Sequence, residues 1–217
     1  MKRICMKFLK NLVSDMKKMI PAIFLLLPAI GLAQATPEFD RLKNAFENQM
    51  VFEATFVHEY NDTFTGEQQV TEGIIWVGKD RYKIRSGNNT MLVDGEISRV
   101  YDAAKNRVIV SDYVEEDDDF APSRMLQGVD DSYAVDESSD SSETIILLTS
   151  DDPFAIFLQV VIVLDKDGLP LRVEAIDQVE NELTTFFQSG RFTEETSETF
   201  RFQPPDGAEQ IDLRHGS

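Results

Sequence analysis

The chain has 217 residues, of which 42% are hydrophobic and 28% are charged, the composition of an ordinary globular protein rather than a fibrous or disordered one. Its formal net charge of −18 argues against a nucleic-acid binder, because affinity for the phosphate backbone comes from Lys and Arg. One cysteine, Cys5, cannot form an intramolecular disulfide, and two histidines leave little material for zinc sites or His-based relays.

The N-terminal segment has the pattern of a secretory signal peptide. Six Lys and Arg among residues 2–18 precede an apolar run at residues 20–33 that ends in small residues. This run is shorter than the roughly 20 residues that a membrane-spanning helix requires. Ala33-Gln34-Ala35 predicts cleavage after residue 35, with cleavage after Ala33 as an alternative, and Met16 and Met19 are alternative starts.

Removal of residues 1–35 would leave a single domain, residues 36–217, with 15 Lys and Arg against 38 Asp and Glu, a net charge of −23. Such a charge favours solubility and disfavours contact with an anionic membrane surface. Cys5 precedes the apolar run, so it would be removed with the signal and cannot carry a lipid anchor. We therefore expect an acidic, exported protein without a thiol.

The first half of this domain is predicted to be one helix followed by an antiparallel meander. Apolar residues recur with helical spacing from Phe39 to Met50, after a Thr36-Pro37 start that is typical of helices. The period then becomes two, and turn sequences rich in Gly, Asn and Asp separate the segments. Strands are predicted at residues 52–60, 69–77, 81–85, 90–94, 97–101 and 107–113.

Two acidic segments, around residues 114–119 and 128–142, interrupt the alternation and are predicted to be mobile loops. Between them, residues 120–128 combine an early proline, two apolar residues and a final glycine, which predicts a short helix. Strands resume at residues 143–148, 156–164, 169–176, 183–192 and 199–202. About ten or eleven strands with one clear helix predict a large curved sheet or an incomplete barrel.

No recognisable catalytic arrangement accompanies these elements. His58 is expected to end a strand and His215 to lie in a disordered tail, and neither has a nucleophile motif around it. The sequence DKDG at residues 165–168 is a hairpin turn rather than a calcium loop, because Ile176 stands where such a loop needs a glutamate. We therefore expect no enzyme activity, no metal and no cofactor.

Among the residue types of this chain, the fifteen Phe and the single Trp are the most informative about function. On the inner face of a curved sheet, such side chains either pack against a helix as core or line a cavity for an apolar ligand. Composition favours the core, and periodicity does not separate the two readings because both need the same alternation.

Motifs distributed through the domain resemble the periplasmic lipoprotein carrier family LolA. The matching segments are FEATF at 52–56, GIIWV at 73–77, YKI at 82–84, VDG at 93–95 with YD at 101–102, and FQPPDG at 202–207. Together and in this order, these motifs indicate the family more specifically than any single motif does.

The resemblance implies a fold that is mainly β with α: an unclosed antiparallel β-barrel, or half-barrel, of about 10–11 strands, covered by an N-terminal helix and a short lid helix. It implies a monomeric periplasmic carrier and not an enzyme. The carrier would shield the acyl chains of lipoproteins and pass them from an inner-membrane ABC-type transporter to an outer-membrane lipoprotein acceptor. The expected acyl-binding residues are Phe46, Phe52, Phe56, Trp76, Tyr82, Ile84, Met91 and Val93, and the expected lid residues are Met125, Leu126 and Lys79.

The sequence also departs from the family pattern. Lys79 is the closest substitute for an arginine that helps to hold the family's lid shut, and lysine lacks the planar fork of arginine. Arg99 stands where an aromatic residue is usual. Two alternatives stay open: a carrier of another amphiphile, such as a glycolipid, and a periplasmic sensor or regulator on the same fold. Such sensors carry a second domain, for which the expected mature length leaves no room.

Overall fold

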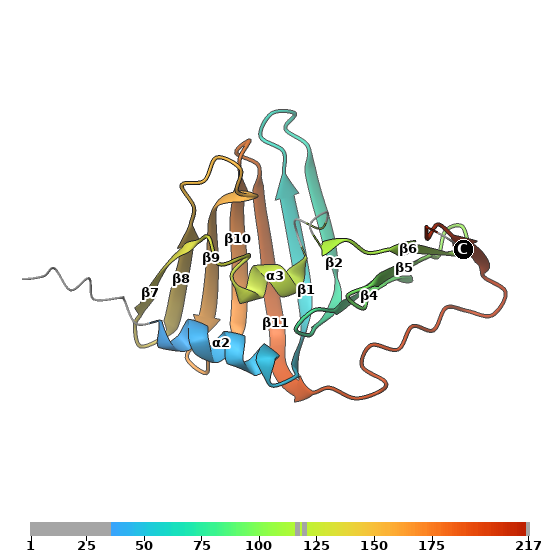
Figure 1. Ribbon diagram of the computed structural model, residues 1–217, viewed down its shortest axis with the longest axis horizontal. Coiled ribbons are helices and arrows are strands. Elements are labelled where there is room, and N and C mark those ends of the chain that lie inside the picture. The colour runs from blue at the N-terminus through green and yellow to red at the C-terminus, as the bar shows by residue number, and fades with distance from the viewer. Residues whose placement is uncertain (1–35, 116–117, 119–120, 216–217) are drawn as a thin grey trace, which may run out of the picture. The chain divides into compact units, whose positions relative to one another are not determined.

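In the computed structural model, the alternation of apolar and polar residues builds one sheet of twelve strands. The structure describes residues 36–115, 118 and 121–215, all of which belong to one compact unit, residues 34–217. The strand order is β12-β6-β5-β4-β3-β2-β1-β11-β10-β9-β8-β7, and the sheet does not close into a barrel (Figure 1). The expectation of an open half-barrel with helices is therefore confirmed.

The strands are joined mainly as neighbouring antiparallel pairs. Their bounds are β1 (Met50–Asn61), β2 (Gln68–Val77), β3 (Tyr82–Ser86), β4 (Asn89–Val93), β5 (Ile97–Asp102), β6 (Arg107–Asp112), β7 (Ala134–Ser139), β8 (Glu143–Thr149), β9 (Phe157–Asp165), β10 (Pro170–Asp177), β11 (Glu182–Glu194) and β12 (Glu209–Asp212). Ten of these overlap the predicted strands.

Two parts of the predicted pattern differ from the structure. Residues 134–139 form β7, where an acidic loop was expected, and residues 199–202 form no strand. The last strand is instead β12, which pairs with β6 in parallel. Of the other predicted acidic loop, residues 116, 117 and 119 lie outside the described residues.

Helix α2 (Pro37–Glu47) covers the inner face of the sheet (Figure 1). Phe39, Leu42 and Phe46 form its buried side, as their helical spacing predicts. Thr36 makes no side-chain cap; the carboxylate of Glu137 in β7 accepts hydrogen bonds from the first-turn backbone N–H groups of Glu38 and Phe39, at 3.3 and 3.0 Å. A strand that was expected to be a loop thus supplies the negative charge that the helix N-terminus favours.

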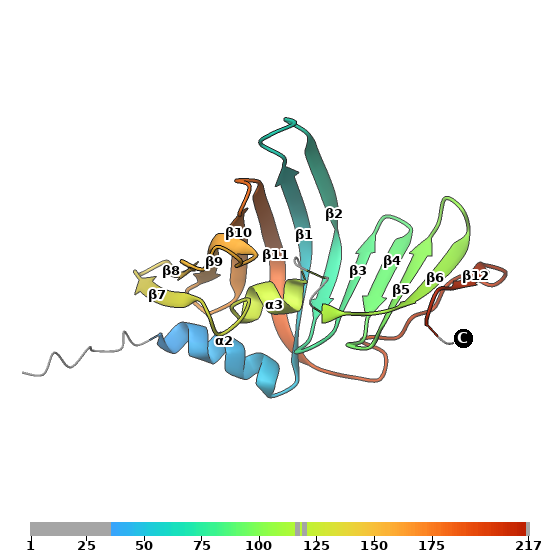
Figure 2. The ribbon, with the colours of Figure 1, turned by 45° about the horizontal axis from the view of Figure 1, so that its top comes forward.

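Helix α3 (Pro122–Gln127) is the short helix that the sequence predicts, and it also lies over the inner face (Figure 2). Gly128 ends it with φ 102°, a left-handed conformation that glycine adopts without strain. A Cβ on Gly128 would lie 2.7 Å from the Phe39 ring, so glycine also allows α3 to pack closely on α2. Neither α2 nor α3, the helices in the described part of the chain, is long and apolar enough to cross a membrane.

The segment between β11 and β12 covers part of the outer face. The Lys83 ammonium on β3 donates a hydrogen bond to the Thr199 carbonyl, and the guanidinium of Arg81 lies 3.3 Å from the Glu195 carboxylate. The segment then joins β12, at the far edge of the sheet (Figure 2). Residues 195–208 therefore connect the middle of the sheet to its edge across the face that the helices leave bare.

Two phenylalanines provide a matched test of this packing. Phe46 is 0% exposed and its ring meets that of Phe192 edge-on at 5.5 Å, whereas Phe64 is 96% exposed. We expect Phe46→Ala to lower the free energy of unfolding by about 3–5 kcal/mol, because it leaves a cavity in the core. Phe64→Ala should change it by less than about 0.5 kcal/mol. Urea unfolding of both variants measures this, and equal effects would contradict the assignment of the core.

Candidate functional site

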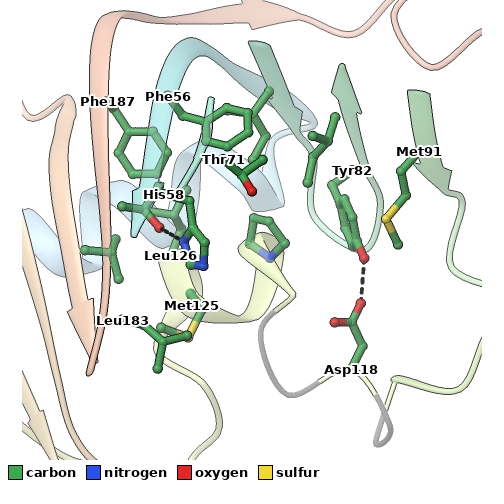
Figure 3. Close-up of a pocket in the computed structure, with 15 residues that line it drawn as sticks. Phe56, His58, Thr71, Tyr82, Met91, Asp118, Met125, Leu126, Leu183 and Phe187 are labelled. Atoms are coloured by element: carbon green, nitrogen blue, oxygen red, sulfur yellow. Dashed lines mark hydrogen bonds between the residues drawn. The ribbon is translucent and has the colours of Figure 1, made fainter. Parts of the chain in front are cut away.

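A pocket of about 290 Å³ lies between the inner face of the sheet and helix α3 (Figure 3). Ten of its fifteen lining residues are apolar. The sheet contributes mostly from its central strands, through Phe56, Ile75, Ile84, Val173, Leu183 and Phe187. The side chain of Met91, on β4, extends this wall.

The register of the strands explains this wall. Phe56 of β1 pairs with Phe187 of β11, and Ile75 of β2 pairs with Ile84 of β3. Successive residues of a strand point to opposite faces, so these pairs all present their side chains to the inner face. An apolar surface therefore continues across neighbouring strands without any single strand being wholly apolar.

Helix α3 forms the opposite wall with Pro122, Met125 and Leu126. The buried side chains of Met125 and Leu126 join α3 to the hydrophobic core, and polar contacts hold its edges. The Gln127 side-chain amide donates to the Lys79 carbonyl at 2.6 Å, and the Arg124 guanidinium donates to the Glu115 carbonyl at 3.1 Å. Six helical residues held in this way form a small cover over the pocket.

A polar group interrupts the apolar sheet wall. His58 Nδ1 and Thr185 Oγ1 lie 2.8 Å apart in a hydrogen bond, and Thr71 faces His58 from the paired position on β2 (Figure 3). Burial lowers the pKa of His58 from its ordinary value of 6.5, because desolvation disfavours the charged imidazolium. The imidazole is therefore neutral at pH 7, and the pocket presents hydrogen-bonding groups there without a fixed charge.

A second polar group lies where the pocket approaches the acidic segment. The Tyr82 hydroxyl donates to Asp118 Oδ2 at 2.6 Å, and the Tyr113 hydroxyl donates to the same oxygen at 3.0 Å. Burial and this carboxylate raise the pKa of Tyr82, so the phenol stays protonated as a donor. The two tyrosines thus both bind Asp118, a residue of the acidic segment 114–119.

The structure brings together about half of the residues that the sequence predicts for the site. Phe56, Tyr82, Ile84 and Met91 line the pocket, as do the lid residues Met125 and Leu126. Phe46, Phe52 and Val93 are fully buried and lie outside its lining. The Phe52 ring meets that of Phe187 edge-on at 5.3 Å, so Phe52 supports the pocket wall from behind.

Trp76 and Lys79 lie elsewhere. Trp76 is on the outer face, with the Lys83 ammonium 4.5 Å from its ring centroid, because the inward positions of β2 are those of Gly73, Ile75 and Val77. This corrects the expectation that Trp76 lines the cavity. The Lys79 ammonium lies 2.7 Å from the Glu47 carboxylate on α2, and its carbonyl holds Gln127 of α3. Lys79 therefore connects both helices, without entering the pocket.

Several pocket residues were missed by sequence reasoning. His58 continues the alternating series Phe52, Ala54 and Phe56, so the sequence alone could have predicted that its side chain points to the inner face. Leu183, Thr185 and Phe187 alternate in the same way on β11. What the sequence does not contain is the pairing of β1 with β11, which brings these two series together.

Among its described lining residues, the pocket has one histidine and one carboxylate, His58 and Asp118. Within residues 36–115, 118 and 121–215, no group of three or more His, Cys, Asp and Glu is placed to hold a metal ion. The partner of His58 is a threonine hydroxyl on a neighbouring strand. The described fold and site define a class: an open, helix-covered antiparallel half-barrel with an apolar pocket under its shorter helix.

Comparison with known proteins adds similarity of fold. No protein-family model matches the sequence, and neither does any curated protein. An uncharacterised conserved protein of Thermus thermophilus is similar in structure with a TM-score of 0.50 at 12% identity, over 80% of this chain and 98% of that one. A LolA superfamily protein of Nitrosomonas europaea gives 0.43 at 10% identity, over 76% and 96%. The lipoprotein LppX of Mycobacterium tuberculosis gives 0.34 at 11%, over 70% and 92%. At identities of 10–12%, these similarities concern the fold alone.

The half-buried imidazole of His58 predicts a pH dependence of stability. A His whose pKa is lowered in the folded state binds fewer protons than in the unfolded state, so the free energy of unfolding falls as the pH drops through 6.5. We expect His58→Gln, which keeps a hydrogen-bonding group for Thr185, to lose less stability than the wild type between pH 7 and pH 5. Urea unfolding across this range measures the difference, and parallel curves would show that His58 is not shielded from water.

Proposed function

We propose that the protein is a carrier that shields acyl chains in the pocket under helix α3. The observation that carries this proposal is the mainly apolar wall that includes Phe56, Ile84 and Phe187 and faces Met125 and Leu126 across the pocket. Ordinary core packing would fill such a space, because protein interiors contain few voids larger than a water molecule. An unfilled apolar space at the surface of a half-barrel is typical of a ligand site.

The energetics favour an acyl chain as ligand. Each methylene group removed from water contributes about 0.8 kcal/mol. A cavity of about 290 Å³ has room for roughly ten groups of the size of a water molecule, at about 30 Å³ each. Ten methylenes would then contribute about 8 kcal/mol before the costs of ordering the chain and the protein. The neutral His58 with Thr185 would receive a polar group of the ligand, such as an ester.

The size of the pocket also limits the cargo. Room for roughly ten such groups is less than one long acyl chain, and a triacylated lipoprotein carries three. We infer that helix α3 moves away when cargo of this size binds. Such a movement would break the hydrogen bonds of Gln127 and Arg124 and expose the buried side chain of Leu126. In the closed form, the pocket favours a smaller single-chain amphiphile, which remains the second candidate cargo.

The role of each predicted residue follows from its place. Phe56, Tyr82, Ile84 and Met91 would contact the acyl chain, and Met125 with Leu126 would form the lid. Lys79 would hold the lid through its carbonyl rather than its ammonium group. Phe46, Phe52 and Val93 would keep the walls in place without touching the ligand.

The transfer role rests on the sequence. A signal peptide pattern at residues 1–35 and motifs that resemble the lipoprotein carrier family support an exported, periplasmic carrier without enzyme activity. Such a carrier would receive lipoproteins from an inner-membrane ABC-type transporter and deliver them to an outer-membrane acceptor. Each step would be driven by the difference in affinity between successive binding sites.

Filling the pocket should remove binding while leaving the fold intact. Ile84 faces the pocket, and its neighbour Arg85 is exposed on the outer face. We expect Ile84→Trp to weaken the binding of a fluorescent fatty acid by at least about tenfold, or roughly 1.4 kcal/mol. Arg85→Trp, the matched control, should bind as the wild type does. Equal affinities of the two variants would remove the pocket from the proposal.

The transfer role has its own test. Purified residues 36–217 are mixed with inner-membrane vesicles that carry a labelled triacylated lipoprotein, a competent transporter and ATP. We expect the lipoprotein to leave the vesicles in a one-to-one soluble complex with the protein. If the fatty acid binds but no lipoprotein is released, the cargo is another amphiphile, and mass measurement of the co-purified lipid identifies it.

A further inference from the structure

Three connections gather at one end of the sheet, at the top in Figure 1: the β1–β2 loop (62–67), the β8–β9 loop (150–156) and the β10–β11 turn (178–181). Alternate connections of an antiparallel sheet come to the same end. The strands of these loops are neighbours in the order β2-β1-β11-β10-β9-β8. Strand spacing places successive loops about 10 Å apart.

Each of these loops exposes an apolar side chain. Phe64 is 96% exposed, Phe154 is 92% exposed and Val179 is 69% exposed. We name these three residues the apolar rim. Large apolar side chains grouped on a soluble protein mark a site of interaction more often than single ones do.

The three loops share one local structure. The backbone N–H groups of Phe64, Phe154 and Val179 donate to the carboxylate of the aspartate two positions earlier, at 3.0, 2.9 and 2.9 Å. The aspartates are Asp62, Asp152 and Asp177. Side-chain hydrogen bonds of this kind fix tight turns. The rim residues are thus presented outward by ordered turns and not by irregular loops.

Hydrogen bonds also join the loops to one another. The Thr63 backbone N–H donates to Asn181 Oδ1 at 3.2 Å, and the Gln178 side-chain amide donates to the Asp152 carbonyl at 3.5 Å. Leu183, two residues after Asn181, already lines the pocket. Hydrogen bonds thus hold together the three loops that carry the apolar rim, at the end of the sheet.

The charge around the rim has one sign. Residues 59–69, 150–156 and 177–182 contain eight Asp and Glu and no Lys or Arg. An anionic lipid surface would repel this end of the protein. A surface of the opposite charge would be attracted to it and would accelerate the encounter.

We propose that the apolar rim docks onto a partner protein whose surface carries apolar pockets surrounded by Lys and Arg. Aromatic side chains seated in pockets supply most of the affinity in such interfaces, and the surrounding charges mainly set the association rate. The proposal does not depend on which cargo the pocket holds.

Three variants separate the contributions. F64S/F154S/V179S removes the apolar rim, and E67Q/D151N/E180Q removes three charges while keeping the aspartates that hold the turns. V114S/L213S is the matched control, because these side chains are 48% and 59% exposed outside the three loops. Unfolding midpoints and fatty-acid binding should stay the same for all three.

The experiment places a photo-crosslinking amino acid at Thr65, beside Phe64, in the full chain produced in its own cells. We expect one adduct with another protein, whose purified domain binds the wild-type chain in a salt-dependent manner. The rim variant should weaken this binding by at least about tenfold, mainly through faster dissociation. The charge variant should slow association at low salt by about tenfold and flatten the salt dependence.

Four outcomes would overturn the proposal: no adduct, an adduct that the rim variant leaves unchanged, an adduct of two copies of this chain, or rim-dependent binding to phosphatidylcholine vesicles with or without phosphatidylglycerol. The V114S/L213S control must behave as the wild type in every assay. Fatty-acid binding is measured on the same samples. A failure of the carrier proposal is therefore visible separately from a failure of the rim.

Discussion

The fold depends on one constraint: in the described part of the chain, two short helices have to cover the inner face of a wide sheet. Helices of 11 and 6 residues are about 16 and 9 Å long. Twelve strands span roughly 53 Å across the sheet. The longer helix α2 packs against the sheet through Phe39, Leu42 and Phe46. Helix α3 covers its part of the sheet mainly with Met125 and Leu126. The pocket lies where α3 covers the inner face without filling the space beneath it.

The sequence predicted the parts of this arrangement that depend on local pattern. Alternation identified ten strands, and helical spacing with Pro and Gly identified both helices. The sequence-based prediction failed where the position of a side chain depends on a residue that is distant in sequence. A motif placed Trp76 in the cavity, although the alternation of side chains along β2 places it on the outer face. His58 was overlooked because its partner Thr185 lies 127 residues away in sequence.

Polar composition was the other source of error. Residues 134–139 read as a loop because their side chains are mostly acidic or small, yet they form an edge strand. Edge strands need no apolar outer side, and charged side chains on them discourage pairing with other molecules. Glu137 has a further use there, because its carboxylate caps α2. The same composition is therefore compatible with a loop and with a strand, and the pairing with β8 and the contact with α2 distinguish them.

The pairing of β1 with β11 has a consequence for how the chain reaches this structure. Residue Met50 is paired with Glu194, so the centre of the sheet forms only when nearly the whole chain is available. Closing a loop of this length costs about 4 kcal/mol of chain entropy before the contacts compensate for it. Folds dominated by such distant pairings form slowly. The centre of the sheet is therefore a late part of the structure, and its apolar strands stay without partners until the C-terminal third of the chain joins them.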